Sequence, residues 1–556
     1  MSEVSNWQIA SLLLRHAKLL ELAGESAFRS RAFSHAAESV QNASESIAIL
    51  AREDRIRDVA GVGQGIATAI EQILTTGSFA AHDELTSRFP ETLVELITVP
   101  GIGAKTAQRL FLESQIDSLV ALENALESGK IRETKSLGLR IETVVRSGLE
   151  QIRRRTGRMP LGIALPLAEA FMAAYRAVCP ADEITLAGSA RRWEITVADL
   201  DFVIVAPAPD TSVQAIAAMP MVSSVTYCRE RTARVALAGT LHADLYFSKA
   251  STFAADLLQA TGSTRHLELL GELPAEAASE EEIYANRGFT WIPPELRAGY
   301  DEFDRSALIS LLVTDRDIHG EFHAHTTWSD GSGTIREMAE AAEVKGYSFL
   351  GITDHSHGLG IAGGLDEERL AAQRYEISSV ERTQSVKLLA GAEVEVHRDG
   401  SLDFDYGTLA RLDVVVASLH SGLRQPRAAL TERLMRVLEN PNVDIIAHPS
   451  GRLIERRESG DFDWERVFTV AARTGTALEI NADPSRLDLD PRMAQAASGA
   501  GCLITINSDA HNPSGFSVMK YGVKMARKAW LKPEQILNCW SRERILEWLA
   551  ARNPQV

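Results

Sequence analysis

Side chains that can bind a metal ion stand at or near the ends of seven short apolar runs in the C-terminal part of the chain. They are imidazoles and carboxylates without thiolates, a mixture that suits Zn²⁺, Mn²⁺ or Fe²⁺. One tetrahedral ion cannot use so many ligands, so two or three ions are expected. Clustered metal ions activate water and brace a phosphoryl group, which favours phosphoester hydrolysis over peptide or sugar chemistry. The side chains are His323, His325, Asp354, His355, Glu393, His420, His448, Glu479, Asp509 and His511.

The runs that carry these side chains must bring them together. Each run is short and apolar, and helical patterns lie between the runs, which predicts buried parallel strands. A β/α barrel gathers the C-terminal ends of such strands around one mouth. A lone histidine at one strand end is typical of a core or loop residue, so the repetition carries the prediction of a multi-metal site. The runs span residues 318–325, 347–355, 386–394, 412–420, 443–448, 476–480 and 502–511.

A second constellation of carboxylates lies in the middle third of the chain. Asp199 and Asp201 are two apart in a predicted strand and therefore share one face. With Asp244 on another predicted strand, they suit two Mg²⁺ ions that clamp an in-line phosphoryl displacement. Gly188-Ser189 can hold a triphosphate with backbone and hydroxyl groups, and Arg192 can offset its charge. An isolated Asp-x-Asp pair is typical of a strand edge, but the whole set favours nucleotidyl transfer.

Two glycine-rich segments punctuate the N-terminal third, where residues 8–50 read as two amphipathic helices around Gly24-Glu25-Ser26. Each segment places Gly-Val-Gly or Gly-Ile-Gly between helical patterns. Glycine permits a tight turn that leaves backbone N–H groups at a helix start free to meet a phosphate oxygen. One such segment is typical of an ordinary helical connection, whereas two in tandem resemble helix-hairpin-helix motifs, which bind DNA without reading sequence. The candidate DNA contacts are Gly61, Gly63, Gly65, Gly101, Gly103 and Lys105.

Charge is distributed unevenly over the chain, whose formal net charge is −17. Residues 1–158 carry 19 Lys and Arg against 20 Asp and Glu, whereas residues 159–315 carry 11 against 21. DNA binding is therefore expected in the N-terminal third, because affinity follows phosphate neutralisation. Residues 137–140 offer a degenerate third hairpin, and Arg153, Arg154, Arg155 and Arg158 form a basic run that by default is a solvated helix end.

The composition is that of an ordinary soluble protein of several domains, with 556 residues, 45% apolar and 24% charged. The start of the chain is polar and does not resemble a signal peptide. No apolar run long enough to cross a bilayer is expected. The four cysteines have no disulfide or metal spacing, which predicts a reducing cytoplasm.

Residues 1 to about 310 resemble DNA polymerase family X. The resemblance implies a polymerase-beta-like nucleotidyltransferase core that uses Mg²⁺ or Mn²⁺ and takes dNTPs as substrates. The matched residues are Asp199, Asp201 and Asp244 in the catalytic triad, Gly188, Ser189 and Arg192 in the nucleotide-binding motif, and Gly262 and Ser263 in the thumb segment.

Several positions depart from that family's pattern. Gln259 and Ala260 replace an aromatic pair that packs against the incoming sugar, and Leu267 replaces an asparagine that touches the base. Trp193 replaces a glycine beside the triphosphate. Ala69 stands where DNA polymerase beta carries its lyase lysine, so Schiff-base chemistry is not expected. Together with the acidic middle third, these changes predict a slow or weakly binding polymerase, although the intact aspartates still favour activity.

The segment from about His319 to Trp548 resembles the PHP (polymerase and histidinol phosphatase) domain, a distorted seven-stranded β/α barrel. The resemblance implies that Glu479 and Asp354 orient neighbouring groups and are not ligands. Bacterial family X polymerases (PolX) combine all these segments, and their PHP domain acts as a Mn²⁺-dependent 3′-to-5′ exonuclease, with 3′-end-cleaning and abasic-site activities in some members. The nine matched ligands are His323, His325, Asp330, His355, Glu393, His420, His448, Asp509 and His511.

The expected fold class is a multidomain α and α/β protein. It combines a helical helix-hairpin-helix domain, a polymerase-beta-like nucleotidyltransferase core and a C-terminal distorted seven-stranded β/α barrel. The predicted parts are an N-terminal DNA-binding domain (1–90), a second hairpin region (91–158), a palm (159–248), a thumb (249–314) and the barrel (315–556).

The leading hypothesis is a DNA-repair enzyme that fills gaps at the aspartates and processes 3′ ends at the barrel mouth, with two or three Mn²⁺, Zn²⁺ or Fe²⁺ ions in the barrel. Its expected partners are dNTPs and gapped, nicked or 3′-recessed DNA, and no membrane association is expected. The protein is expected to be a monomer in the cytoplasm, at the nucleoid. The alternative is a nuclease or phosphatase whose polymerase core is weak or inactive and docks DNA. The ligand count opposes a non-catalytic DNA-end scaffold, since a structural site needs far fewer ligands, and the paired hairpins disfavour a small-molecule phosphatase.

Overall fold

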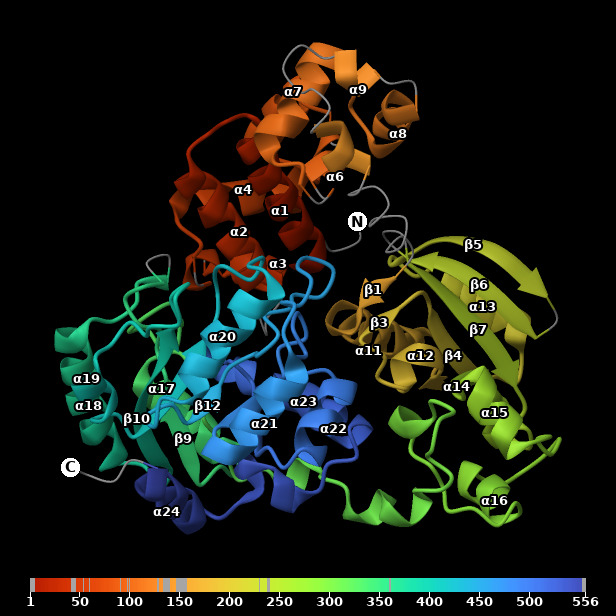
Figure 1. Cartoon of the computed structure of the whole chain (residues 1–556). Coiled ribbons are helices and arrows are strands. Elements are labelled where there is room, and N and C mark those ends of the chain that lie inside the picture. Colours follow the sequence, from red (N-terminus) through yellow and green to blue (C-terminus); the bar gives the residue numbers. More distant parts are fainter. Residues whose placement is uncertain are drawn as a thin grey trace. The chain divides into compact units, whose positions relative to one another are not determined.

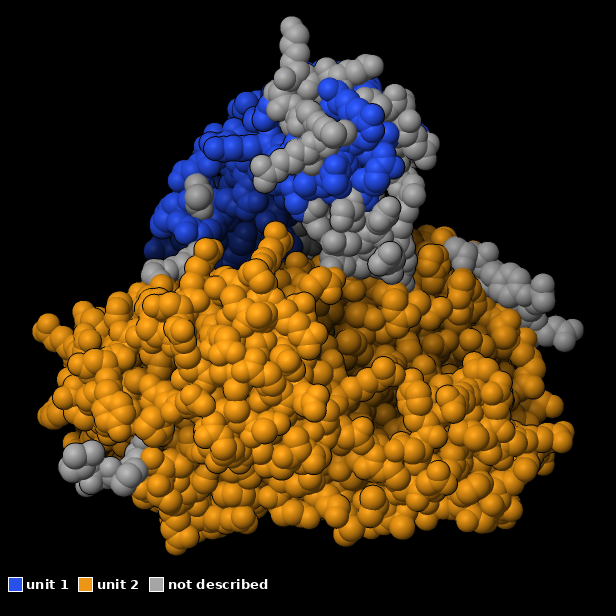
Figure 2. Space-filling view, viewed as in Figure 1, with its two compact units in different colours: residues 1–156 blue, residues 157–556 orange. Residues whose placement is uncertain are grey.

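The structure, a computed structural model, describes residues 6–41, 47–53, 55–59, 61–90, 92–97, 99, 101–127, 130–133, 141–146, 158–229, 231–237, 241–359 and 362–552. The chain forms two compact units, Met1–Thr156 and Gly157–Val556, coloured separately in Figure 2. The degenerate third hairpin at residues 137–140 and the basic residues 153–155 lie outside the described residues. The five-part division into domains stays a prediction.

The first unit is helical, as the sequence predicts (Figure 1). Gly24, with a φ of 72°, reverses the chain between α1 and α2. The second predicted helix, which extends to residue 50, is covered by α2 and α3, and residues 42–46 between them lie outside the described residues. Gly63 and Gly103 are the N-cap residues of α4 and α7. The helices are α1 (Asn6–Leu22), α2 (Ala27–Gln41), α3 (Ile47–Arg52), α4 (Gln64–Thr76), α5 (Ala80–Arg88), α6 (Leu93–Ile97), α7 (Ala104–Ser114), α8 (Leu119–Glu127) and α9 (Lys130–Glu133).

The second unit opens with a five-stranded sheet in the order β2-β4-β7-β6-β5, which we call the palm sheet. Its strands β4 and β7 are parallel, and they bring Asp201 level with Asp244. The apolar helix α11 packs here, with the rings of Phe171 and Phe202 4.9 Å apart. The elements are β1 (Met159–Pro160), α11 (Leu161–Val178), β2 (Glu183–Leu186), α12 (Gly188–Arg191), β3 (Thr196–Val197), β4 (Leu200–Val205), α13 (Pro209–Ala217), β5 (Val222–Arg229), β6 (Thr232–Leu237) and β7 (His242–Ser248).

Helix α11 corrects one expectation from the sequence. By length and composition it is apolar enough to cross a membrane, although no such run was expected. Leu161, Phe171 and Tyr175 are buried in the core that α11 shares with the palm sheet. A core helix passes the same test as a membrane span, and 33% of α11 is buried inside the protein.

Three helices that follow the palm sheet are tied back to it by one carboxylate. They are α14 (Phe253–Thr261), α15 (Thr264–Leu270) and α16 (Glu280–Ala285). Glu280, at the start of α16, accepts hydrogen bonds from Arg191 at 2.8 and 3.1 Å and from Arg297 at 2.8 Å twice. Arg191 is therefore neutralised inside the protein.

The barrel follows, and its seven strands are parallel and pair in chain order from β8 to β14. Strands β9, β10 and β12 are labelled in Figure 1. A bridge between Ala324 and Ala510 nearly closes the ring. Apolar side chains such as Phe322 and Val416 fill its interior. The elements are β8 (Gly320–Glu321), α17 (Ile335–Val344), β9 (Phe349–Ile352), α18 (Glu367–Glu381), β10 (Lys387–Glu395), α19 (Tyr406–Leu409), β11 (Val414–Ser418), α20 (Arg427–Leu438), β12 (Ile445–Ile446), α21 (Trp464–Thr474), β13 (Ala477–Asn481), α22 (Pro491–Gly499), β14 (Ile504–Asn507), α23 (Met519–Lys528) and α24 (Arg542–Arg552).

The predicted β/α barrel is therefore confirmed, with each of the seven apolar runs containing one strand. Five strands are shorter than their runs, because most ligand-bearing ends leave the hydrogen-bonded ladder, whereas β10 and β13 end one residue beyond theirs. His448 and Asp509 even have positive φ angles, 28° and 56°. Such strained backbone is concentrated at functional sites, where it aims a side chain.

Candidate active sites

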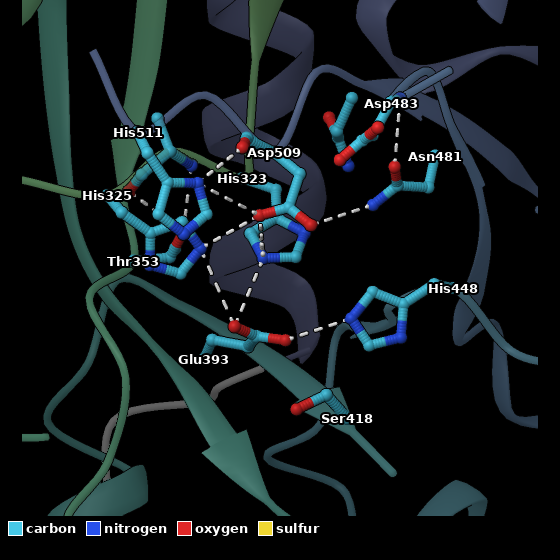
Figure 3. Close-up of polar contacts among 12 residues, drawn as sticks. His323, His325, Thr353, Glu393, Ser418, His448, Asn481, Asp483, Asp509 and His511 are labelled. Carbon is cyan, nitrogen blue, oxygen red and sulfur yellow. Dashed lines mark hydrogen bonds and ion pairs between the residues drawn. The ribbon is translucent and has the colours of Figure 1, made fainter. Parts of the chain in front are cut away.

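The barrel mouth brings all nine predicted ligands together. Their ligand atoms form three groups within which all atoms lie within 4.8 Å of one another. The groups are His325, Asp330, His355 and His511; His323, His325 and Glu393; and His355, Glu393 and His420. The remaining two ligands touch these groups. Nε2 of His448 lies 3.2 Å from Oε1 of Glu393, and Oδ1 of Asp509 lies 3.0 Å from Nε2 of His325 (Figure 3).

Several of these atoms are buried without a hydrogen-bond partner among the described residues. They are Nε2 of His323, both ring nitrogens of His325, Oε2 of Glu393 and Nδ1 of His448. A buried polar atom without a partner is costly, and a coordinated cation removes that cost. The donor set of imidazole and carboxylate therefore fits metal ions, as the expected Mn²⁺, Zn²⁺ or Fe²⁺ requires.

Carboxylates outside the ligand set orient the imidazoles. Oε1 of Glu479 lies 2.8 Å from Nδ1 of His323, and Oε2 of Glu479 accepts the backbone N–H of His448 at 2.7 Å. Oε2 of Glu395 lies 2.8 Å from Nδ1 of His420. A partner on one ring nitrogen fixes the tautomer and aims the other nitrogen at the metal. The sequence-based analysis missed Glu395, although it is two residues from Glu393 and so shares its strand face.

Asp354 supports the loop after the first strand instead of the metal cluster. Its carboxylate accepts hydrogen bonds from the backbone and hydroxyl of Thr326 at 2.8 and 2.7 Å and from Nε2 of Gln373 at 2.6 Å. These contacts use oxygens that a metal would need. Asp354 therefore holds the segment that carries Asp330.

Charges in the cluster keep the carboxylate ligands ionised. Burial would raise the pKa of Glu393, but His355, His323 and His420 outweigh burial and hold it well below its usual value. Burial would lower the pKa of His355, but Glu393 and Asp330 raise it to about 10. The carboxylates are thus anionic at neutral pH, the form in which they bind cations.

Arg486 brings a guanidinium group to the same cluster from the loop between β13 and α22. Its Nε lies 3.8 Å from Oδ2 of Asp509. Its Nη1 is buried and has no hydrogen-bond partner among the described residues. A cationic donor of this kind beside a metal cluster can bind a phosphate oxygen. The sequence-based analysis missed Arg486, because a lone arginine in a loop has no informative spacing.

The palm sheet brings the three predicted catalytic aspartates together. Asp201 on β4 is paired in register with Asp244 on β7, and Asp199 lies directly before β4. Burial first, and then the charges of Asp199 and Asp244, raise the pKa of Asp201 to about 6. Mutual repulsion of this kind is what a bound cation relieves, so the three carboxylates fit a metal ion.

An arginine that the sequence-based analysis missed also faces these aspartates. Arg234, on β6, is paired in register with Asp244. Its Nε donates to Oδ1 of Asp244 at 2.6 Å, and its Nη2 lies 3.3 Å from Oδ2 of Asp199. Arg234 therefore offsets the charge of two of the three carboxylates, and it contacts oxygens that a metal ion would use.

The predicted nucleotide-binding residues lie beside the aspartates. A Cβ atom on Gly188, which has a φ of 63°, would lie 1.8 Å from Oδ2 of Asp201, so only glycine fits there. Nη1 of Arg192 donates to the carbonyl oxygen of Thr261 at 2.7 Å. Thr261 directly precedes Gly262 and Ser263, and the hydroxyl of Ser263 caps α15. The structure thus brings Arg192 to the predicted thumb segment.

The predicted DNA contacts of the first unit are exposed glycines at two helix starts and one exposed lysine, Lys105. Gly61 and Gly101 have φ angles of 75° and 88°, in the left-handed region that favours glycine. Gly63 and Gly65 lie at the start of α4, and Gly103 directly precedes α7. The first N–H groups of an α-helix have no partner within the helix, so both starts can accept an anion.

Comparison with known proteins agrees with this arrangement. Family models of the helix-hairpin-helix domain and the PHP domain match residues 4–79 and 321–482. The chain is 34% identical to a DNA polymerase/3′-5′ exonuclease PolX of Bacillus subtilis (strain 168), over 96% of this chain and 97% of that protein. It is 29% identical to a probable phosphatase of Thermoanaerobacter sp. (strain X514), over 39% of this chain and 88% of the relative. A probable phosphatase of Shewanella loihica is 28% identical over 42% of this chain and 93% of the relative.

Proposed function

Because this chain belongs to the bacterial family X DNA polymerases (PolX) that carry a helix-hairpin-helix domain and a C-terminal PHP domain, we propose that it repairs DNA by two chemistries. The palm aspartates carry template-directed gap filling, and the barrel mouth carries 3′-to-5′ exonuclease and 3′-end processing. The observation that supports this proposal most strongly is the barrel cluster, in which five buried nitrogen and oxygen atoms have no hydrogen-bond partner among the described residues.

At the barrel mouth, the nine predicted ligands would hold two or three ions, with Mn²⁺, Zn²⁺ and Fe²⁺ as candidates. The ions would supply activation of water and neutralisation of charge at the scissile phosphate. Glu479 and Glu395 hold the rings of His323 and His420 in place. Arg486 offers its unpartnered Nη1 to a phosphate oxygen.

In the palm, Asp199, Asp201 and Asp244 would hold Mg²⁺ or Mn²⁺, which neutralises the charge that develops on the transferring phosphoryl group. The residues that would bind the triphosphate of a dNTP are Gly188, Ser189, Arg192, Gly262 and Ser263. The glycine at position 188 leaves room for the carboxylate of Asp201.

The substrate we propose is gapped, nicked or 3′-recessed DNA, which the chain meets as a monomer in the cytoplasm, at the nucleoid. The two helix starts of the first unit would grip the phosphate backbone without reading sequence. The residues proposed for this contact are Gly61, Gly63, Gly65, Gly101, Gly103 and Lys105.

A second candidate function is a PHP nuclease or phosphatase whose palm is weak and docks DNA. The contacts of Arg234 with Asp199 and Asp244 favour it, because a metal ion must displace the guanidinium. The relatives named probable phosphatases also support it.

One experiment separates the two candidates. A 5′-labelled primer on gapped DNA is incubated with Mn²⁺ or Mg²⁺, with and without dNTPs. Wild type is compared with Asp199→Ala/Asp201→Ala and with His323→Ala/His325→Ala. Extension lost only in the aspartate variant, with shortening lost only in the histidine variant, supports the main proposal. Shortening without extension supports the second candidate, and neither product from wild type refutes both.

A further inference from the structure

A lysine of the barrel is attached to the palm segment that carries Arg192. Nζ of Lys528, the last residue of α23, donates to the carbonyl oxygens of Arg192 and Trp193 at 3.0 and 3.3 Å, and to Oε1 of Glu194 at 2.9 Å. The side chain of Lys528 is only 13% exposed. A nearly buried ammonium is stable only when its donors are satisfied. These three hydrogen bonds of Lys528 are all with one palm segment, residues 192–194.

The backbone of Trp193, in the segment that Lys528 contacts, has a strained conformation. Its φ is 55°, in the region that favours glycine. A large residue is strained there unless its surroundings hold it. The Trp193 ring packs edge-on against Tyr521 of α23, with centroids 5.3 Å apart, and Nζ of Lys524 lies 5.7 Å from its centroid. Such outliers point to a function for the contact that they maintain.

The junction between palm and barrel is continuous beyond these residues. One apolar core contains both Phe202 of the palm sheet and Ile506 of the barrel. A Cβ atom on Gly162 of α11 would lie 2.2 Å from Cβ of Pro484, so the two parts meet without space for a side chain. Oε1 of Glu295 also receives hydrogen bonds from two basic residues of α23. A displacement of α23 is therefore transmitted to the palm.

The segment that Lys528 holds borders a cavity that two of the predicted nucleotide-binding residues, Arg192 and Ser263, also line. Arg192, Ser263 and Lys528 line the same cavity, which has a volume of about 870 Å³. The guanidinium of Arg192 is fixed on its other side by the carbonyl oxygen of Thr261. Lys528 holds the backbone of Arg192 while Thr261 holds its side chain. Together the two contacts define where the guanidinium lies relative to the cavity.

We propose that Lys528 is a positioning residue for nucleotide binding in the palm, so that a barrel residue completes the polymerase site. The inference rests on the function proposed for the palm. It predicts that the affinity for the incoming dNTP depends on the barrel helix α23. Lys528 does not reach the barrel metal cluster, so exonuclease activity should not depend on it.

The test uses the full-length protein with Lys528→Met, which keeps the length of the side chain and removes its charge and donors. Lys520→Met is the matched control, because Lys520 lies on the same helix and pairs with Glu169 at 3.5 Å on the exposed surface. We expect the KM for dNTP to rise about tenfold in Lys528→Met, the loss expected for charge-assisted hydrogen bonds, with kcat changed less than twofold. Primer shortening and the apparent Tm should match those of wild type. Lys520→Met should behave as wild type in every assay.

Glu194→Gln gives a second test, because it removes the carboxylate charge that pairs with Nζ of Lys528 at 2.9 Å. It should also raise KM for dNTP and leave primer shortening unchanged. Direct binding of α,β-imido-dATP is measured by calorimetry for every variant. If wild type extends no primer, the proposed polymerase function fails. The measured affinity for α,β-imido-dATP still tests whether Lys528 positions the nucleotide site. An unchanged affinity in Lys528→Met, or a joint loss of affinity, exonuclease activity and Tm, overturns the inference.

Discussion

Removal of Arg234 should make the palm bind metal ions more tightly. Arg234 contacts the carboxylates of Asp199 and Asp244, which the metal ions of a nucleotidyl-transfer site would use. Arg234→Gln keeps most of the volume and hydrogen-bonding capacity but removes the charge. We therefore expect this variant to need less Mn²⁺ or Mg²⁺ for half-maximal nucleotide incorporation.

The size of the effect follows from the exposure of the contacts. The side chain of Arg234 is 44% exposed, so water screens both ion pairs. Each exposed pair is worth roughly 0.2–1 kcal/mol. A cation that binds both carboxylates must displace both ion pairs, so removing the two pairs should make the free energy of cation binding more favourable by about 0.5–2 kcal/mol. At about 1.4 kcal/mol per tenfold change in affinity, the palm should bind the metal ion roughly two- to thirtyfold more tightly.

The assay needs a measure of metal binding that is independent of catalysis. Free Mn²⁺ is counted by electron paramagnetic resonance during titration of the protein, in a His323→Ala/His325→Ala background that weakens the barrel site. Arg234→Lys retains the charge and should stay near wild type. Arg231→Gln is the matched control, because Arg231 is 54% exposed and pairs with Asp256 at 3.0 Å.

Two results would refute this reasoning about Arg234. The first is equal or weaker Mn²⁺ binding in Arg234→Gln than in its parent. The second is unchanged metal binding with a raised KM for dNTP, which would mean that Arg234 serves the substrate. In either case the guanidinium does not compete with the cation.

Three further predictions concern the barrel and the contact of α16 with the palm. Glu479→Gln removes the charge beside Nδ1 of His323 and should raise the metal concentration for half loading about ten- to hundredfold, measured by plasma mass spectrometry. Arg486→Gln should lower kcat/KM of primer shortening about tenfold or more, since a charge-assisted hydrogen bond is worth about 1.5–3 kcal/mol, and Arg486→Lys should recover part of it. Burial would raise the pKa of Glu280, but its hydrogen bonds from arginines lower it to about 2. The stabilisation of the folded state by ionised Glu280, about 3 kcal/mol, is therefore present above pH 4.5 and lost as the pH falls toward 2. The difference in apparent Tm between wild type and Glu280→Gln should shrink over the same pH range.

Each of these predictions has a result that contradicts it, and the Arg486 prediction has a matched control. Arg473→Gln is the control for Arg486, because Arg473 is 61% exposed on α21 and pairs with Glu439. Normal metal loading in Glu479→Gln would show that Glu479 does not orient a ligand. Full exonuclease activity in Arg486→Gln would remove this residue from phosphate binding. A pH-independent difference in Tm would mean that Glu280 acts by packing alone.

Much of the fold followed from local patterns. Apolar runs separated by helical segments predicted seven parallel strands, and the structure has β8 to β14 in that order. Parallel strands with helical crossovers place all their C-terminal ends on one side, which is why residues as distant as His325 and His511 meet. The family resemblance inferred from the sequence is also confirmed. The exact strand ends were not predictable, because boundaries depend on tertiary packing.

The sequence by itself determined which residues can bind metals, and on which strand ends they lie, because these depend on residue type and short repeats. Only the tertiary structure decided what surrounds them. Arg234 reaches the palm aspartates across a strand pairing, Arg486 reaches the barrel ligands from a loop, and Lys528 reaches Trp193 from 335 residues away. No regular spacing in the sequence predicts such contacts. They form when segments that are distant in the sequence pack together and their buried polar groups form hydrogen bonds with one another.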